Sequence, residues 1–493
     1  MGLKYTSTRG DKKQYSASSA IICGLADDGG LFVPDHIPSL DVALSSLVGK
    51  GYKDIAYEVL KLFLDDYTED ELKDCINKAY DSKFDTDEFA PLVKKDGQYF
   101  LELFHGPTIA FKDMALSILP HLLTCALVKN HIDEKVVIMT ATSGDTGKAA
   151  LAAFANVKDT KIIVYYPKGG VSPIQERQMV TQIGDNTKVV GVTGNFDDCQ
   201  TGVKKMFNDG ALKDELASKG YRFSSANSIN IGRLIPQVVY YVYSYVKMME
   251  FGEIEEGSPL NFTVPTGNFG NILAAYYAKH MGVPIGKLVC ASNINNVLYD
   301  FFETGTYDRN RDFILTSSPS MDILISSNLE RLIYHSVGDD PQKNAALMKE
   351  LTQTGKYTVD ESARKVMDDF VGIYATEDQV FDTIRRYSKA GYVIDTHTAV
   401  AAYANLEYRK KDDTVSVVVS TASPYKFTAN VLKAIDERFV SSDDFEMADK
   451  LCSISGVPIP GAISSLKDAK ILHDTVCEVE EMKTTLKDWL GLA

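Results

Sequence analysis

A single lysine in the segment 101–113 has the setting of a nucleophilic amine. The segment reads LELFHGPTIAFKD, and its Gly-Pro-Thr at 106–108 predicts a turn. A helical pattern follows the turn, so Lys112 is expected near the start of a helix. The positive helix end and partial burial both disfavour a charged amine, and Schiff-base chemistry requires a neutral one. The alternative is a surface lysine whose stem lies along its apolar neighbours.

Three further segments share one design: a β-branched run, a loop of small residues, and then a helical pattern. The loops are TSGDTG at 142–147, TGNFGN at 266–271 and TAS at 421–423. In a parallel sheet such loops leave at the carboxyl edge, so they can converge on one crevice. The N–H groups and dipole of each following helix favour an anion there. Each loop alone is equally compatible with a structural turn, but three in one chain favour a binding site.

Two nucleotide-binding motifs and a metal site are excluded by spacing. GDTGK at 144–148 resembles the end of a P-loop, but Thr142 stands at the first glycine position and Ala149 replaces the metal-binding hydroxyl. GNFG at 267–270 lacks the spacing of a dinucleotide fingerprint. The 7 cysteines form no CxxC pair and the 8 histidines form no HExxH cluster, so no metal is expected.

The elements that must position these residues alternate between short strands and helices from about residue 99. This alternation predicts an α/β fold with mostly parallel, twisted sheets flanked by helices. Residues 1–95 are expected to form a helical N-terminal domain, 96–440 the catalytic region with insertions at 300–390, and 441–493 a C-terminal appendage. The predicted strands are 136–141, 161–166, 188–193, 261–264, 287–291 and 415–420.

Composition excludes several classes of protein. The 493 residues are 45% hydrophobic and 24% charged, which is typical of a globular protein with a large core. The net charge of −15 argues against nucleic acid or an anionic membrane as a partner. No signal peptide and no apolar run of about 18 residues is found, so we expect a cytoplasmic enzyme with reduced cysteines.

Taken together, these segments resemble the threonine synthase family, which are pyridoxal 5'-phosphate (PLP) enzymes of fold type II. The similarity covers most of the chain, and HGPTIAFKD, SGDTG and GNFGN in this order are its most specific part. The matching segments are GLADDGGLFVP, ELFHGPTIAFKD, TATSGDTG, YYPKGGVSPIQE, SANSINIGRL, PTGNFGN, SPSMDI, YVIDTHTAV and STASPYKF.

The resemblance implies a role for each motif. Lys112 would form the Schiff base with PLP, and Thr421 would bond the pyridine nitrogen. The cup for the cofactor phosphate would consist of Gly267, Asn268, Phe269 and Asn271. The amino-acid part of the substrate would bind to Ser143, Gly144, Asp145 and Thr146. The substrate phosphate would bind among Asn227, Ser228, Arg233, Lys168 and Arg177, each of which could equally be an ordinary polar surface residue.

The implied reaction converts O-phosphohomoserine and water into L-threonine and phosphate by γ-elimination and β-hydration, the work of a carbon–oxygen lyase. Domain closure would then move residues of about 136–240.

Two positions depart from the family pattern: Asn271 replaces an aspartate and Ser423 replaces a histidine. The alternatives are a threonine or serine dehydratase, another phospho-amino-acid lyase, or a non-catalytic metabolite-binding protein. The partner is a small molecule, and the enzyme would be a monomer or a homodimer.

Overall fold

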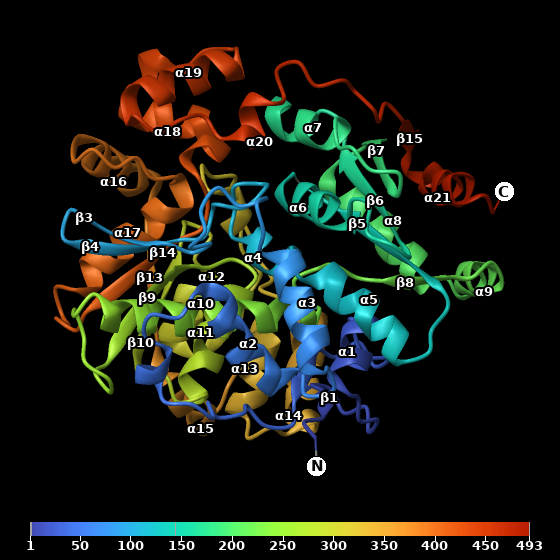
Figure 1. Ribbon diagram of the computed structural model, residues 1–493, viewed down its shortest axis with the longest axis horizontal. Helices are drawn as coiled ribbons and strands as arrows, with labels where there is room; N and C mark the ends of the chain where they lie inside the picture. The colour runs from blue at the N-terminus through green and yellow to red at the C-terminus, as the bar shows by residue number, and fades with distance from the viewer. Residues whose placement is uncertain (1, 143, 493) are drawn as a thin grey trace.

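The computed structural model describes residues 2–142 and 144–492 and contains two mostly parallel sheets, each flanked by helices (Figure 1). The larger sheet has six strands in the order β13-β10-β9-β14-β4-β3. Only its β3–β4 pair is antiparallel. The smaller sheet has five parallel strands in the order β15-β7-β6-β5-β8. The predicted fold class is therefore confirmed.

The large sheet is buried on both faces, as its continuous apolar strands require. Its strands are β3 (Leu92–Lys95), β4 (Gln98–Glu102), β9 (Leu260–Pro265), β10 (Ile285–Ser292), β13 (Phe370–Tyr374) and β14 (Ser416–Ser420). Its principal helices are α10 (Ile231–Glu250), α11 (Gly270–His280), α16 (Glu377–Lys389) and α17 (Thr396–Tyr408). Helix α10 packs along α11 and also contacts α2 (Tyr52–Phe63) of the N-terminal region.

The small sheet carries its own layer of helices (Figure 1). Its strands are β5 (Lys135–Ala141), β6 (Thr160–Pro167), β7 (Thr187–Thr193), β8 (Tyr221–Ser224) and β15 (Val476–Glu478). Its helices are α6 (Asp145–Phe154), α7 (Pro173–Val180), α8 (Phe196–Asn208), α9 (Gly210–Ser218) and α21 (Met482–Leu490). No helix in the described residues is long and apolar enough to cross a membrane.

All six predicted strands are present, as β5, β6, β7, β9, β10 and β14. The other strands of the two sheets, β3, β4, β8, β13 and β15, were not predicted. The segment QYFLE of β4 is buried at every position, but its polar first and last residues conceal the apolar run. Its polar ends are satisfied only by the folded structure, where Gln98 and Glu102 meet tyrosine side chains far away in the sequence.

The N-terminal region is mainly helical, as expected, but it also contains a short β-ribbon. Its helices are α1 (Ala17–Cys23), α2 and α3 (Glu69–Ala79), and its ribbon pairs β1 (Tyr5–Ser7) with β2 (Phe32–Pro34). Helix α1 packs on α5 (Leu119–Lys129), which lies between β4 and β5 in the sequence. The region is thereby fastened to the catalytic part of the chain.

Three expected boundaries differ from the observed packing. The segment 300–390 is not only an insertion, because it supplies β13 and α16 to the large sheet and its helical layer. The segment 441–493 is more than an appendage, because β15 pairs with β7 and α19 (Asp444–Ser455) packs on α18 (Thr428–Ile435). The expected mobile part, 136–240, does not coincide with the small-sheet unit: α10 packs with the helices of the large sheet, and β15 returns to the small sheet near the end of the chain.

Candidate active site

The lysine segment is attached directly to the end of β14. Lys112 is the first residue of α4 (Lys112–Leu116). The N–H of the preceding Phe111 donates to the carbonyl of Thr421 at 2.8 Å, and the N–H of Ser423 donates to the carbonyl of Ile109 at 3.0 Å. The parallel register of β4 with β14 brings these two loops to the same sheet edge. Lys112 and Thr421 therefore lie side by side although they are far apart in the sequence.

Lys112 is placed in a setting that favours its neutral form. Its side chain is 14% exposed, and Nζ lies 3.9 Å from Oδ2 of Asp145. Burial lowers the pKa of Lys112, and the nearby charges of Lys426 and Arg233 lower it further, against the opposing effect of Asp145. A buried amine with a lowered pKa can act as a nucleophile or as a base.

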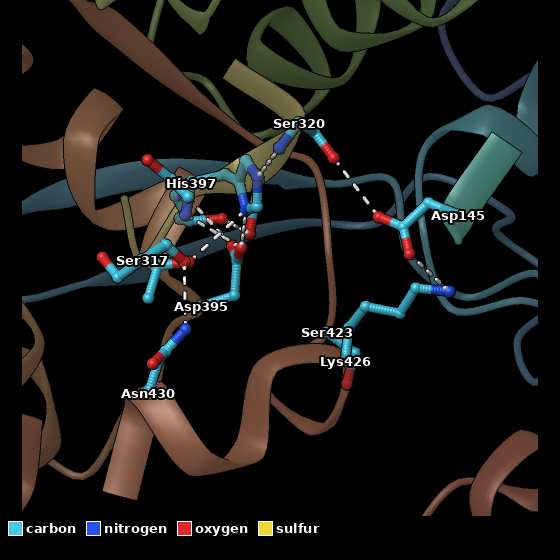
Figure 2. Close-up of polar contacts among 12 residues, drawn as sticks. Asp145, Ser317, Ser320, Asp395, His397, Ser423, Lys426 and Asn430 are labelled. Carbon is cyan, nitrogen blue, oxygen red and sulfur yellow. Dashed lines mark hydrogen bonds and ion pairs between the residues drawn. The ribbon is translucent and has the colours of Figure 1, made fainter. Parts of the chain in front are cut away.

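A second buried lysine, Lys426, faces the same carboxylate (Figure 2). Its Nζ lies 3.3 Å from Oδ1 of Asp145 and donates to the carbonyl of Thr108 at 3.2 Å. This residue was not predicted from the sequence. Its signal was a lysine between two aromatic residues in STASPYKF, directly before a helical pattern, which is an unusual place for a solvated cation.

Asp145 connects the two halves of the molecule. Burial raises its pKa, but the ammonium groups of Lys426 and Lys112 outweigh that effect and hold the pKa well below its usual range. Its Oδ1 also accepts from Nε2 of Gln175 at 3.0 Å, and its Oδ2 accepts from the hydroxyl of Ser320 at 3.2 Å. The carboxylate at the start of α6 therefore contacts Gln175 of its own sheet unit and, from the large-sheet side, Ser320 and Lys426, which Figure 2 shows.

The loop that carries Ser320 is held by a histidine on α17. The backbone N–H of Ser320 donates to Nε2 of His397 at 3.1 Å, and Nδ1 of that ring lies 2.8 Å from Oδ2 of Asp395. Because Nε2 accepts, the proton is on Nδ1 and points to the carboxylate. The nearby carbonyl of Ser317 accepts from Asn430 at 3.3 Å (Figure 2). This side of the site is therefore rigidly bonded.

The loop between β9 and α11 forms a cup at the helix N-terminus. Phe269 adopts a left-handed conformation with φ of 65°, and no side chain caps the first turn of α11. The loop carbonyls point outward, where Ser326 donates to Gly267 at 2.6 Å and Nδ2 of Asn328 donates to Asn268 at 3.0 Å. A side chain at position 267 would meet the carbonyl of Ser320 at 2.5 Å, so only glycine fits. An uncapped helix end of this kind suits a phosphate.

Two buried donors near this cup lack partners within the described part of the chain. They are Nδ2 of Asn271 and Nε of Arg233. Both residues are buried, and burial lowers the pKa of Arg233 to about 10. Nη1 of Arg233 donates to the carbonyl of Ala226 at 3.0 Å, and no carboxylate is among its partners in the described residues. Buried donors and an uncompensated cation fit a site built for an anionic group such as the PLP phosphate.

The remaining predicted residues are divided between the site and the surface. Gly144 has a φ of 131° and lies against Gln175, while Asp145 and Thr146 open α6. Ser143 lies outside the described residues. Asn227 and Ser228 precede α10, where the carbonyl of Asn227 accepts from the N–H of Asn230 at 3.1 Å.

Lys168 and Arg177 have other partners than the expected anion. Lys168 pairs with Glu176 and its side chain is 49% exposed. The guanidinium of Arg177 donates to backbone carbonyls of the C-terminal segment, at Lys467 and Ala469. All three basic residues lie in segments that match the family, so the sequence did not show which of them is near the lysine. Arg233 is, since it lies close enough to lower the pKa of Lys112.

The chain is similar to family models, curated sequences and solved structures of known proteins. Three family models match: "Threonine synthase N terminus" at 4–80, "Pyridoxal-phosphate dependent enzyme" at 87–421 and "Threonine synthase, C-terminal" at 398–458. A threonine synthase of Schizosaccharomyces pombe is 37% identical over 490 residues, covering 92% of each chain. The PLP-bound threonine synthase of Brucella melitensis superposes with a TM-score of 0.88 at 36% identity, covering 99% of each chain.

A longer human relative, "Threonine synthase-like 1", is also similar. It is 39% identical over 456 residues, which cover 90% of this chain. The chain spans 61% of the length of that relative. The similarity to the fission-yeast protein, in contrast, extends over nearly the whole of both chains.

Proposed function

The chain belongs to the threonine synthase family, and we propose that it converts O-phosphohomoserine and water into L-threonine and phosphate. The observation that carries this proposal is a concentration of buried cations at one place. Lys112 and Lys426 face the carboxylate of Asp145, and Arg233 lies close enough to lower the pKa of Lys112. These three cations outnumber the two nearby buried carboxylates, Asp145 and Asp113, in a chain whose net charge is −15. Such a local excess of positive charge is suited to a substrate and a cofactor that both carry phosphate.

The cofactor is pyridoxal 5'-phosphate, which when bound stabilises a carbanion beside the amino group of an amino acid. Lys112 would hold it covalently through Nζ. The cup at 267–271 would bind its phosphate with the free N–H groups of α11 and with Asn271. The Thr421 hydroxyl would face the ring nitrogen without protonating it, because an alcohol is far weaker as an acid than the aspartate found in other PLP folds.

Lys112 would also move the protons of the reaction. Once the substrate has freed the Lys112 amine, Nζ can accept the proton from the α-carbon of the substrate. Burial supports this role because it lowers the pKa of the lysine and keeps a fraction of the amine neutral. The same Nζ would later return protons to the carbon chain, since it lies beside Asp145 and directly follows Phe111, which bonds Thr421.

The substrate would be oriented by its two anionic ends. Its carboxylate would bind at the start of α6, at 143–146, where the helix dipole favours an anion. Its phosphate would bind between Lys426 and Arg233, with Asn227 and Ser228 as additional donors. Two buried cations with few partners of their own support this assignment.

Exclusion of water is needed until phosphate has left. Asp145 supports a closure of the small-sheet unit, because it bonds Ser320 on one side and Gln175 on the other. We propose that the moving part is 135–224 with its C-terminal strand, rather than all of 136–240. Closing the unit onto substrate would strengthen each charge interaction in the site.

The test is an assay of phosphate release, with threonine measured in parallel, from PLP-loaded protein and O-phosphohomoserine. We expect equal amounts of phosphate and threonine. Serine and threonine are offered separately, with ammonia and 2-oxo acid as products to be measured. Turnover of those two without release of phosphate from O-phosphohomoserine would replace the proposal with a dehydratase.

A cytoplasmic location and a monomeric or homodimeric state complete the proposal. The seven cysteines are free thiols, which is the usual state in a reducing compartment. Light scattering of the purified chain would give the oligomeric state directly, and a tetramer would contradict this part of the proposal.

A further inference from the structure

The side chain of Asn271, the second residue of α11, is held by two tyrosines. Its Oδ1 accepts from the hydroxyl of Tyr240 at 2.5 Å and from the hydroxyl of Tyr241 at 2.7 Å. Asn271 is 7% exposed, and both tyrosines are fully buried.

The amide of Asn271 turns its oxygen toward the two hydroxyls. Oδ1 can only accept, so each hydroxyl donates a hydrogen to it. Nδ2 then faces the opposite direction with two N–H groups. It has no hydrogen-bond partner among the described residues. A buried donor without a partner costs free energy, so a ligand acceptor is expected where these N–H groups point.

The tyrosines are themselves held on one face of α10. Arg233, Gln237, Tyr240 and Tyr241 follow helical spacing, so their side chains share a face. Nε2 of Gln237 donates to the carbonyl of Arg233 at 2.7 Å, and Oε1 of Gln237 lies 3.1 Å from the Tyr240 hydroxyl. The two tyrosine rings pack with centroids 4.8 Å apart. This face of α10 is a fixed support behind the cup.

We propose that Tyr240 and Tyr241 are positioning residues for the cofactor phosphate, and that they do so by holding the Asn271 amide with both N–H groups directed into the cup. An unsupported amide could turn and present its oxygen to the phosphate, which would repel it. The proposal rests on PLP as the cofactor and not on the identity of the substrate. Its test therefore measures binding without turnover.

The test is titration of the full-length chain, stripped of cofactor, with pyridoxal 5'-phosphate. We expect Tyr241→Phe and Tyr240→Phe each to raise the dissociation constant about fivefold, since each removes one of two hydrogen bonds that orient the donor. The ³¹P resonance of the bound cofactor should shift in both variants. Tyr245→Phe is the control for the loss of a buried tyrosine hydroxyl in general. Tyr245 lies on the same helix, and its hydroxyl donates to the carbonyl of Ser258 at 2.9 Å, away from the cup.

A double-mutant cycle separates positioning from packing. Asn271→Ala removes the donor through which the tyrosines act, so adding Tyr241→Phe to that variant should change the dissociation constant no further. The proposal is overturned if Tyr241→Phe binds cofactor as tightly as the parent with an unchanged ³¹P resonance. It is equally overturned if the effect of Tyr241→Phe persists in the Asn271→Ala background or is matched by Tyr245→Phe.

Discussion

The β9–α11 cup and the start of α6 are built on the same strand–loop–helix plan, but they are held in different ways. The cup is fixed by neutral hydrogen bonds from Asn328 and Ser326 to its outward carbonyls. The start of α6 is held by charge, because Asp145 lies between Lys112 and Lys426. All the partners of the cup belong to the large-sheet side, whereas Asp145 contacts both sheet units.

We propose that this difference distinguishes the binding site of the cofactor, which stays bound, from that of the substrate, which binds and leaves. Neutral bonds to the rear of the cup leave its N–H groups free and in place before any anion arrives. Lys112 and Lys426 pair with the carboxylate of Asp145. To bind a substrate, they would replace part of this pairing by contacts to the anionic groups of the substrate. On this proposal, the large-sheet side is preorganised for cofactor, and the groups between the two sheets respond to substrate.

The largest expected effect is the loss of the lysine that serves both regions. Lys112→Ala should lower phosphate release from O-phosphohomoserine by at least about 10³-fold, because it removes the covalent link and the base together. Release of phosphate is the measurement. Lys158→Ala is the matched control, since the Lys158 side chain is 91% exposed. Retention of full turnover in Lys112→Ala would refute the assignment.

The second prediction isolates the substrate side. Lys426→Met should raise KM for O-phosphohomoserine about 50-fold, because one buried charge-assisted contact to the phosphate is lost. Its dissociation constant for PLP should stay within about twofold of the parent, since the cup is held independently. Lys168→Met, at the exposed pair with Glu176, serves as the control and should leave both constants unchanged. Equal loss of cofactor and substrate binding would erase the distinction between the regions.

The third prediction concerns a charged contact at the end of β4, on the large-sheet side. Nδ1 of His105 lies 2.6 Å from Asp85, and Nε2 lies 2.9 Å from Glu102, which also accepts from Tyr392 at 2.6 Å. Burial lowers the pKa of His105, but the two carboxylates outweigh this and raise it to about 9. The charged histidine should therefore add about 2 kcal/mol to stability.

The sign of this contribution sets its pH window. The stabilisation is fully present below the unfolded value of 6.5 and is lost as pH rises through about 9. Urea unfolding of the parent should show stability falling between these values, and His105→Gln should remove that part of the slope. An unchanged slope in the variant would assign the pH dependence to other groups.

The smallest expected effect is on the support of the cup. Asn328→Ala removes the Nδ2 bond to the Asn268 carbonyl and should weaken PLP binding about fivefold. KM for substrate at saturating PLP should not change, which is the converse of the Lys426 variant. Asn310→Ala removes a comparable amide bond, to Thr354 at 2.9 Å on the exposed surface, and controls for the substitution itself. A change in KM for O-phosphohomoserine with unchanged PLP binding would contradict the assignment of the cup to the cofactor and of Lys426 to the substrate.

Much of the site could be predicted because its signals are local. The turn before Lys112 and the small residues of 266–271 are read from short runs of sequence, and a helix N-terminus favours an anion wherever the helix lies. The six β-branched strands were recognised for the same reason, since burial on both faces requires continuous apolar runs. Strand β4 was missed because its buried polar ends depend on partners elsewhere in the chain.

The fold class, the candidate lysine Lys112 and the three loops of small residues could be predicted from the sequence by itself. Each follows from residue type and spacing over a few positions. Only the tertiary structure decided the counter-charges and supports. It brought Lys426 to Asp145, set Tyr240 and Tyr241 behind Asn271, and turned Arg177 to the carbonyls of the C-terminal segment. The physical reason is that these contacts join helices and loops distant in sequence, and packing of the two sheet units fixes which of them meet.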